Sequence, residues 1–314
     1  MDNLVFSLNA TMPIFLTMVA GWVLKKMGFI DDAFVTRLNK FVFKVALPAM
    51  LFEDLGKENF FQVWDTKFVV FCFSVTLFCI LVIGALSFLW KEKNIQGEFI
   101  QASYRSSAAI LGMAFIQNIY GNSGMAPLMI FASVPLYNMM AVVVLSVMKP
   151  EREPLSRPLI MKTLKGIITN PIILGIVIGM LWSVLGMPMP VILQKTVHNV
   201  GVLATPLGLL SMGGAFEFTN VKKYIAPSIT AAVTKLVILV SIFLPMAVGL
   251  GFRNEKLIAI LVMLGSSTTV SSYIMAKNMG HEGILTSNAV MLTTLFSAFT
   301  LTTWLFILKS LAFI

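Results

Sequence analysis

Two short runs of polar side chains, 160 residues apart, are the part of this sequence most suited to holding a solute. The first run is Arg105-Ser106-Ser107, and the second is Ser266-Ser267-Thr268-Thr269, with Ser271 following after one valine. Serine and threonine hydroxyls donate and accept hydrogen bonds, and the arginine guanidinium donates to carboxylates in a fixed planar geometry. These residue types indicate noncovalent binding of a small polar or negatively charged solute.

The surroundings of both runs are strongly apolar. Of the 314 residues, 58% are hydrophobic and 12% are charged, whereas about a quarter of the residues of ordinary soluble domains are charged. The apolar segments are continuous and lack the alternation expected of barrel strands, so they predict membrane-spanning helices. A polar run facing lipid would cost several kcal/mol. Both runs are therefore expected to line protein or water within the membrane.

Ten segments are predicted to span the membrane, because a span needs about 20 mostly apolar residues. They are 4–24, 34–53, 66–90, 98–119, 125–148, 168–186, 194–216, 226–250, 257–279 and 284–309. Lysine and arginine concentrate in alternate loops, which the positive-inside rule makes cytoplasmic. Both termini are then expected outside the cytoplasm. The longest of these basic loops, 149–165, is predicted to be a cytoplasmic linker between two halves of the chain.

The two halves resemble each other at a nearly constant offset. Residues 45–51 in the second span match residues 203–209 in the seventh, offset by 158, and the two hydroxyl runs are offset by 160. Each half holds five spans, an odd number, so the second half must cross the membrane inverted. We therefore predict an all-α membrane protein of two inverted five-helix repeats, 1–148 and 166–314. This architecture is typical of secondary transporters, whose substrate site lies near the midplane.

The fourth and ninth spans are predicted to be discontinuous helices, unwound around 106–112 and 265–272, which cross near the midplane. The second half of each helix would present free N–H groups and a partial positive charge to the crossing, an arrangement that favours a carboxylate. The alternative is that the hydroxyls bond carbonyls four residues earlier within intact helices. The predicted substrate-binding residues are Arg105, Ser106, Ser107, Thr268, Thr269 and Ser271, together with Pro48 and Pro206 of the second and seventh spans.

Arg105, Lys235 and Lys44 are three of the basic residues that fall within the predicted spans. Arg105 could bind an anion or could extend to the cytoplasmic interface. Lys235 could be functional, since charges inside a membrane usually are, or could bond backbone carbonyls between helices. Lys44 is shallower and is expected to reach the interface. His198 could titrate or serve as a packing residue, and His281 is predicted to be an exposed loop residue.

Carboxylates are missing from the middle of every predicted span, so the sequence gives little support to sodium coupling, although carbonyls and hydroxyls at a broken helix could still hold Na⁺. We find no constellation of histidine and carboxylate at membrane depth that would suit a lipid-modifying enzyme or a metal. The predictions are accordingly no catalytic residue, no metal and no cofactor. The net charge of +9 is spread over short loops and does not indicate nucleic-acid binding. Cys72 and Cys79 are predicted to be packing residues.

Three stretches resemble the auxin efflux carrier family, the bacterial relatives of the plant PIN-type carriers. They are Leu47-Pro48-Ala49-Met50-Leu51-Phe52, Asn170-Pro171-Ile172-Ile173-Leu174-Gly175 and Tyr273-Ile274-Met275-Ala276-Lys277-Asn278-Met279-Gly280. The resemblance implies crossed helices 4 and 9, as in bile-acid symporters and sodium/proton antiporters. It also implies a scaffold of helices 1, 2, 6 and 7 and a transport domain of helices 3–5 and 8–10.

The same resemblance implies elevator-type transport of a small organic anion, such as auxin, malonate or malate, across the bacterial inner membrane. Its expected partners are that anion and the lipid bilayer. Whether the chain forms a homodimer through the scaffold helices is left open. Two alternatives remain at this level. One is a receptor or sensor that uses the fold without turnover, and the other is a cation-coupled carrier of a solute that is not a carboxylate.

Overall fold

The computed structural model describes residues 2–56, 64–109, 113–120, 124–150, 157–186, 188–216 and 222–314, and within these ranges the regular structure is entirely helical. The first half contains α1 (Asp2–Lys26), α2 (Asp32–Phe41), α3 (Leu47–Gly56), α4 (Thr66–Ser87), α5 (Gln96–Tyr104), α6 (Met113–Tyr120) and α7 (Ala126–Val147). The second contains α8 (Arg157–Ile168), α9 (Pro171–Leu185), α10 (Val191–Gly201), α11 (Ala204–Gly214), α13 (Ile225–Val233), α14 (Leu239–Gly249), α15 (Asn254–Gly265), α16 (Val270–Asn278) and α17 (Ile284–Ser310). Two single-turn π-helical segments, Val42–Ala46 and Thr234–Ile238, join α2 to α3 and α13 to α14.

Five helical stretches in the described residues are long and apolar enough to cross a bilayer. They are Thr66–Ser87, Ala126–Val147, Lys222–Gly249, Asn254–Asn278 and Ile284–Ser310, and each coincides with a predicted span to within about four residues at either end. The shorter helix Pro171–Leu185 is also apolar. Helices cover the remaining predicted spans as well, but the count of ten spans and the inverted repeat stay predictions.

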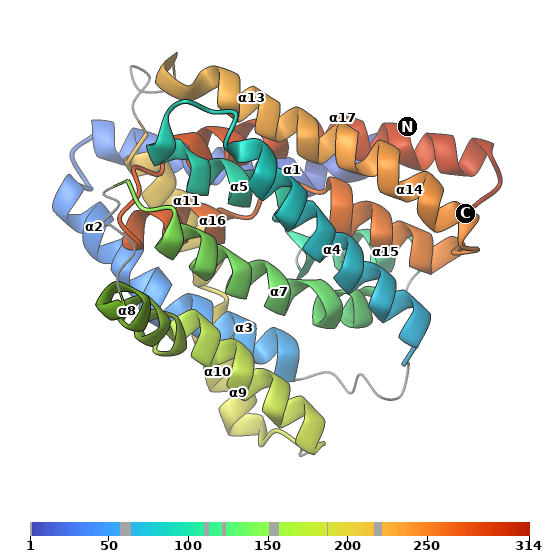
Figure 1. Ribbon diagram of the computed structural model, residues 1–314, viewed down its shortest axis with the longest axis horizontal. Coiled ribbons are helices and arrows are strands. Elements are labelled where there is room, and N and C mark those ends of the chain that lie inside the picture. The colour runs from blue at the N-terminus through green and yellow to red at the C-terminus, as the bar shows by residue number, and fades with distance from the viewer. Residues whose placement is uncertain are drawn as a thin grey trace.

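Close backbone contacts hold α3 against α9 and α1 against α11. A Cβ atom added at Gly175 would lie 2.6 Å from the Pro48 carbonyl oxygen, and one added at Gly213 would lie 1.9 Å from the Met18 carbonyl oxygen. Glycine is therefore required at both positions. In Figure 1, α3, α9 and α10 gather on one side of the molecule, away from α13, α14 and α17.

The predicted linker 149–165 is not entirely irregular, because α8 begins within it at Arg157. Pro158 stands in the first turn of this helix, where proline is tolerated because the N–H that it lacks would have no partner within the helix. The prolines of this loop therefore mark a helix start as well as a connection. Residues 151–156 of the linker lie outside the described residues.

The predicted interruptions are confirmed in both helices. Helix α5 ends at Tyr104 and α6 begins at Met113, while α15 ends at Gly265 and α16 begins at Val270. The backbone is extended where each break begins, with ψ of 131° at Arg105 and 164° at Ser266, and residues 108 and 109 of the first break are already in a π-helical turn. The second break is shorter than predicted, since the helix resumes at Val270, and residues 110–112 of the first lie outside the described residues. Nearly every residue of α5, α15 and α16 is buried, so these broken helices form the interior of the molecule.

Candidate functional site

The two extended segments touch where the broken helices cross. The Ser107 backbone N–H donates a hydrogen bond of 2.9 Å to the Ser267 carbonyl oxygen. This bond joins residues 160 positions apart in the sequence and brings the two hydroxyl runs into one place. Unwound backbone is acceptable at this depth because it is buried in protein and its polar groups find partners there.

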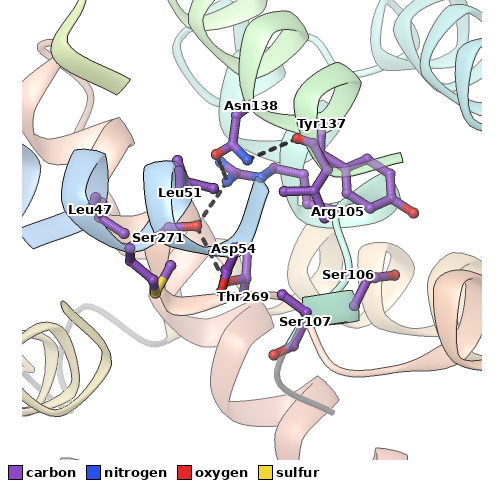
Figure 2. Close-up of a pocket in the computed structure, with 14 residues that line it drawn as sticks. Leu47, Leu51, Asp54, Arg105, Ser106, Ser107, Tyr137, Asn138, Thr269 and Ser271 are labelled. Carbon is purple, nitrogen blue, oxygen red and sulfur yellow. Dashed lines mark hydrogen bonds between the residues drawn. The ribbon is translucent and has the colours of Figure 1, made fainter. Parts of the chain in front are cut away.

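A narrow pocket that is partly open to the outside lies beside this crossing (Figure 2); it has about 440 Å³ of empty space, of which only about 30 Å³ is accessible to the centre of a water molecule. One wall is α3, which contributes Leu47, Met50, Leu51 and Asp54. The opposite wall is built from the two breaks and from α7. The polar residues on that wall are Arg105, Ser106, Ser107, Tyr137, Asn138, Thr269 and Ser271.

Arg105 is the central charge of this pocket and is only 1% exposed. Its Nη2 donates to Asn138 Oδ1 at 2.7 Å and to Ser271 Oγ at 2.8 Å (Figure 2). Its Nη1 contacts Met275 Sδ at 3.0 Å and Gln101 Oε1 at 3.4 Å. Among the described residues these partners are all neutral, and the Nε–H has none. The guanidinium is thus held in place without a bound counter-charge, and the alternative of an arginine reaching the interface is wrong.

Thr269 and Ser271 bring the start of α16 to the same pocket. Thr269 is the N-cap residue, with extended backbone, but its side chain makes no capping hydrogen bond. Instead its Oγ1 lies 3.2 Å from Ser271 Oγ. The first N–H groups of a helix lack partners within the helix and carry partial positive charge. The start of α16 therefore adds hydrogen-bond donors to the positive charge of Arg105.

Two other predicted residues, Thr268 and Ser106, use their hydroxyls to bond neighbouring helices. Thr268 Oγ1 donates to the Ala102 carbonyl oxygen at 2.8 Å, and the Thr268 N–H donates to Thr293 Oγ1 at 2.9 Å. Ser106 lines the pocket, but its Oγ donates to the Met263 carbonyl oxygen and accepts from Lys235 Nζ at 2.6 Å. Both hydroxyls thus connect one broken helix to its neighbours.

The two prolines predicted to touch the substrate do not line this pocket. The backbone of Pro48 faces Gly175 on α9. Pro206 is exposed on α11, and two residues later Gly208 packs against Val270 of α16. Spans 2 and 7 flank the crossing as expected, but the pocket wall comes from other residues of α3.

Sequence reasoning left four residues out of the predicted site that the structure places at the crossing. Tyr137 and Asn138 come from α7, Asp54 comes from α3, and Lys235 bonds Ser106. The sequence does mark Asn138 and Lys235, because each is a polar residue that interrupts a long apolar segment. Asp54 lies one residue beyond the predicted span 34–53. Nothing in the pattern distinguished Tyr137 from an ordinary packing aromatic.

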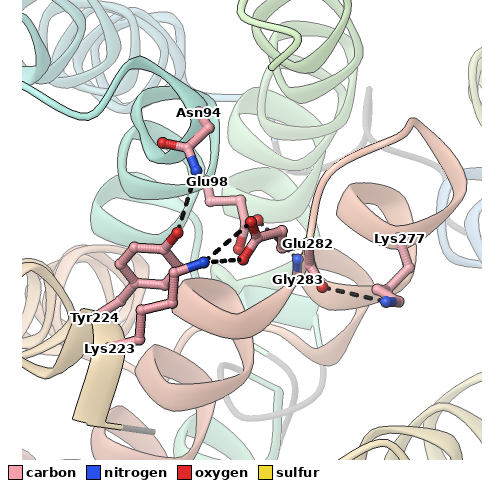
Figure 3. A network of polar contacts seen from close by, with 7 residues as sticks. All are labelled: Asn94, Glu98, Lys223, Tyr224, Lys277, Glu282 and Gly283. Carbon is pink, nitrogen blue, oxygen red and sulfur yellow. Dashed lines mark hydrogen bonds and ion pairs between the residues drawn. The ribbon is translucent and has the colours of Figure 1, made fainter. Parts of the chain in front are cut away.

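A second polar network lies where α5 meets the loop before α17 (Figure 3). Glu98 is 1% exposed and accepts hydrogen bonds from the Gly283 N–H at 2.7 Å and from the Thr286 N–H at 3.0 Å. It therefore caps the first turn of α17. Nearby, Lys223 pairs with Glu282 at 3.2 Å, and its Nζ lies over the Tyr224 ring. This network fastens helices together and lies apart from the pocket.

The histidine predictions are partly wrong. His281 is 4% exposed, with Nε2 2.9 Å from the Leu145 carbonyl oxygen, because the loop after α16 folds back onto the end of α7. His198 joins α10 to α3 through a contact of 2.9 Å between its Nδ1 and Glu53 Oε1. Lys44 is exposed, as predicted, and Cys72 and Cys79 are buried free thiols.

Comparison with known proteins gives a match along almost the whole chain. The family model described as "Membrane transport protein" matches residues 6–305. A protein of Methanothermobacter thermautotrophicus named "Uncharacterized transporter" is 17% identical over 306 residues, which cover 95% of this chain and 97% of that protein.

Proposed function

Because the chain belongs to the membrane transport protein family, that of the auxin efflux carriers, and is a multi-pass membrane protein, we propose that it is a secondary transporter of a small organic anion. The substrate class we propose is a carboxylate, bound at the crossing of the broken helices. The proposed ligands are Arg105, Ser107, Thr269 and Ser271, with Ser106 and Thr268 holding the two breaks in position.

The observation that carries this proposal is that the hydrogen-bond partners of Arg105 in the described residues are all neutral. A guanidinium is charged at every physiological pH, and burying it without a counter-charge is costly. Its four side-chain partners in the described residues are uncharged, and it faces a pocket beside the start of a helix. A substrate carboxylate would supply the missing negative charge. Charge-assisted hydrogen bonds of this kind are about twice as strong as neutral ones.

The wall of the pocket formed by α3 would contact the part of the substrate that lies away from Arg105. The apolar side chains of Leu47, Met50 and Leu51 on the same wall suit the hydrocarbon part of a substrate. This pattern favours a solute with one charged end and an apolar remainder.

A second cavity supports alternating access. It has about 1030 Å³ of empty space, partly open to the outside, and its lining includes Asn39, Tyr273 and Lys277. Tyr273 and Ser271 lie on the same helix, so α16 borders both cavities. We propose that they belong to the access routes on the two sides of the membrane. Lys25 and Lys277 line the larger one, and the positive-inside rule favours the cytoplasmic side for it, in keeping with the proposal that both termini lie outside the cytoplasm in a bacterial inner membrane.

We further propose an elevator-type movement. The close packing of α3 with α9 and of α1 with α11 fits a rigid scaffold. The helices that carry the breaks and α7 would move as a unit past α3. Because the pocket is formed between α3 and these helices, such a movement would expose its contents first to one side and then to the other.

A ligand screen with an arginine variant tests this function. Purified protein is heated with monocarboxylates, dicarboxylates, amino acids and neutral analogues, since a ligand that binds the folded state raises Tm. We expect at least one carboxylate to raise Tm, and we expect Arg105→Gln to abolish the rise. Arg37→Gln, at an exposed position on α2, is the control that should retain it. Stabilisation by neutral solutes with no response to any carboxylate would overturn the proposal.

A further inference from the structure

Lys235 is fully buried in the π-helical segment between α13 and α14, on the side of the crossing away from the pocket. Its Nζ lies 2.6 Å from Ser106 Oγ, 3.4 Å from the Tyr104 carbonyl oxygen and 3.4 Å from the Leu264 carbonyl oxygen. No carboxylate pairs with it in the described part of the chain. All three of its partners belong to the two broken helices.

Hydrogen-bond counting indicates that this side chain is an ammonium ion. Ser106 has one hydroxyl hydrogen, which it donates to the Met263 carbonyl oxygen, so it must accept from Lys235. The other two partners are carbonyl oxygens, which can only accept. Three acceptors match the three N–H donors of an ammonium, whereas a neutral amine has two.

The ends of the two broken helices supply the compensating negative charge. Tyr104 is the last residue of α5, and Leu264 is next to last in α15. Carbonyls in the last turn of a helix lack partners within the helix and carry partial negative charge. The Leu264 carbonyl is free for Lys235 because Thr268, whose N–H would continue the helix, donates to Thr293 Oγ1 instead. The ammonium thus sits where two helix ends converge.

A hydroxyl and carbonyls from helix ends are also the ligands that hold Na⁺ at the broken helices of ion-coupled carriers. We propose that the Lys235 ammonium is a tethered cation that fills a site suited to a monovalent metal ion. Transport by this chain then needs no Na⁺, because the positive charge that joins the helix ends is part of the protein. The proposal depends on the proposed function only in that the chain transports a solute.

The first test measures the wild-type protein in Na⁺, K⁺ and choline salts of equal ionic strength. We expect Tm and uptake of a radiolabelled carboxylate to be the same in all three. Saturable stabilisation by Na⁺, or uptake that requires it, would overturn the proposal. This result decides the question even where a variant does not fold.

The second test empties the site. Lys235→Ala leaves the two helix-end carbonyls and Ser106 without their cation, so we expect a lower Tm that Na⁺, Li⁺ or methylammonium restores in a saturable manner while choline does not. Lys44→Ala, an exposed lysine, is the control and should show no such cation response. Lys235→Met fills the volume without the charge and should lose about tenfold or more in uptake. Wild-type uptake by Lys235→Met would contradict the inference.

The readouts separate this inference from the anion proposal. Cation-restored stability in Lys235→Ala, with no carboxylate stabilising the wild type, would leave the tethered cation standing and remove the anionic substrate. Stabilisation of the wild-type protein by a carboxylate, together with a requirement for Na⁺, would support the anionic substrate and overturn the tethered cation.

Discussion

The two faces of the crossing hold a buried cation each, in opposite surroundings. On the pocket face, Arg105 has neutral side-chain partners, an Nε–H without one, and the start of α16 beside it. On the packed face, Lys235 has an acceptor for each of its three hydrogens, supplied by Ser106 and two helix-end carbonyls. The cation with satisfied partners holds the protein together, whereas the cation with a surplus of donors is available to a ligand.

Helix polarity explains the difference. A break in a helix creates a C-terminal end and an N-terminal end a few residues apart, with opposite partial charges. The C-terminal ends of α5 and α15 converge on Lys235, while α16 begins at the pocket. One pair of breaks would therefore build the proposed cation site and the proposed anion site in adjacent positions. The variants below that alter the crossing itself are expected to affect the two faces unequally.

The largest effect is expected from Thr269→Phe on the pocket face. The side chain of Thr269 lines the pocket, and a phenyl ring there would occupy the space of a substrate. We expect uptake to fall about a hundredfold or more, because small displacements in a site have effects of this size. Tm should stay close to that of the wild type. Uptake assays in vesicles with matched amounts of protein measure the effect, and normal uptake would place the substrate elsewhere.

Arg105→Lys keeps the charge on the pocket face and removes the planar fork. An ammonium cannot engage Asn138 and Ser271 while also presenting two parallel donors to a carboxylate. Hydrogen bonds to charged groups are worth about 1.5–3 kcal/mol, so affinity for the carboxylate should fall about ten- to a hundredfold. Titration calorimetry with the ligand found in the screen measures this. Unchanged affinity would mean that only the charge of Arg105 matters.

Thr268→Val is the matched change on the packed face, one residue from Thr269. It removes the hydroxyl that donates to the Ala102 carbonyl oxygen and leaves that buried acceptor unsatisfied. The expected loss of stability is about 1–3 kcal/mol, read as a lower Tm, with ligand affinity reduced far less than by Arg105→Lys. A variant with normal Tm and lost binding would reverse the assignment of the two neighbouring threonines.

A smaller effect is expected from Ser271→Ala, which removes one neutral partner of Arg105 Nη2. A hydrogen bond of this kind contributes about 1 kcal/mol net, or roughly a fivefold change in affinity. The Asn138 contact remains and still orients the guanidinium. Ser272→Ala, at the next position on α16 and facing away from the pocket lining, is the control. Equal losses in the two variants would argue against a specific role for Ser271.

The positions of the two helix breaks could be predicted from the sequence, whereas the face of the crossing to which each side chain points could not. Hydroxyl runs inside apolar segments signal that helical hydrogen bonds can be replaced by side-chain bonds, and neither 105–112 nor 265–272 contains a proline. The side-chain directions of Thr268 and Thr269 could not be read in advance. In extended backbone, neighbouring side chains point to opposite sides, so the face depends on the residue at which the helix ends.

Lys235 shows a different limit of sequence reasoning. The position of Lys235 within a span can be predicted from the sequence, and bonding to backbone carbonyls is one of the two roles that the sequence leaves open. Its role depends on carbonyls of Tyr104 and Leu264, which lie in helices distant in the sequence and become free only because those helices end there. The packing of α13 against α5 and α15 determines which carbonyls Lys235 contacts, and the sequence around Lys235 does not indicate them.

The smallest effect should arise away from both faces, at the ion pair between Asp65 and Lys256. Asp65 caps the start of α4, and Lys256 stands in the first turn of α15. The hydrogen bond from Lys256, and then that from the Phe68 N–H, lower the pKa of Asp65 below its usual value. A folded-state pKa below the unfolded one contributes stability that is fully present above the unfolded pKa, near 3.9, and is lost as the pH falls through the folded pKa.

Asp65→Asn should therefore reduce Tm slightly at neutral pH and should abolish that part of the acid-induced loss. Surface ion pairs are worth up to about 1 kcal/mol, and an asparagine still caps a helix. Carboxylate affinity and cation response should both match those of the wild type, since the pair touches neither face of the crossing. A change in either would mean that the start of α15 transmits its position to the break at Gly265, eleven residues after Asn254, and that the two faces are less independent than their contacts indicate.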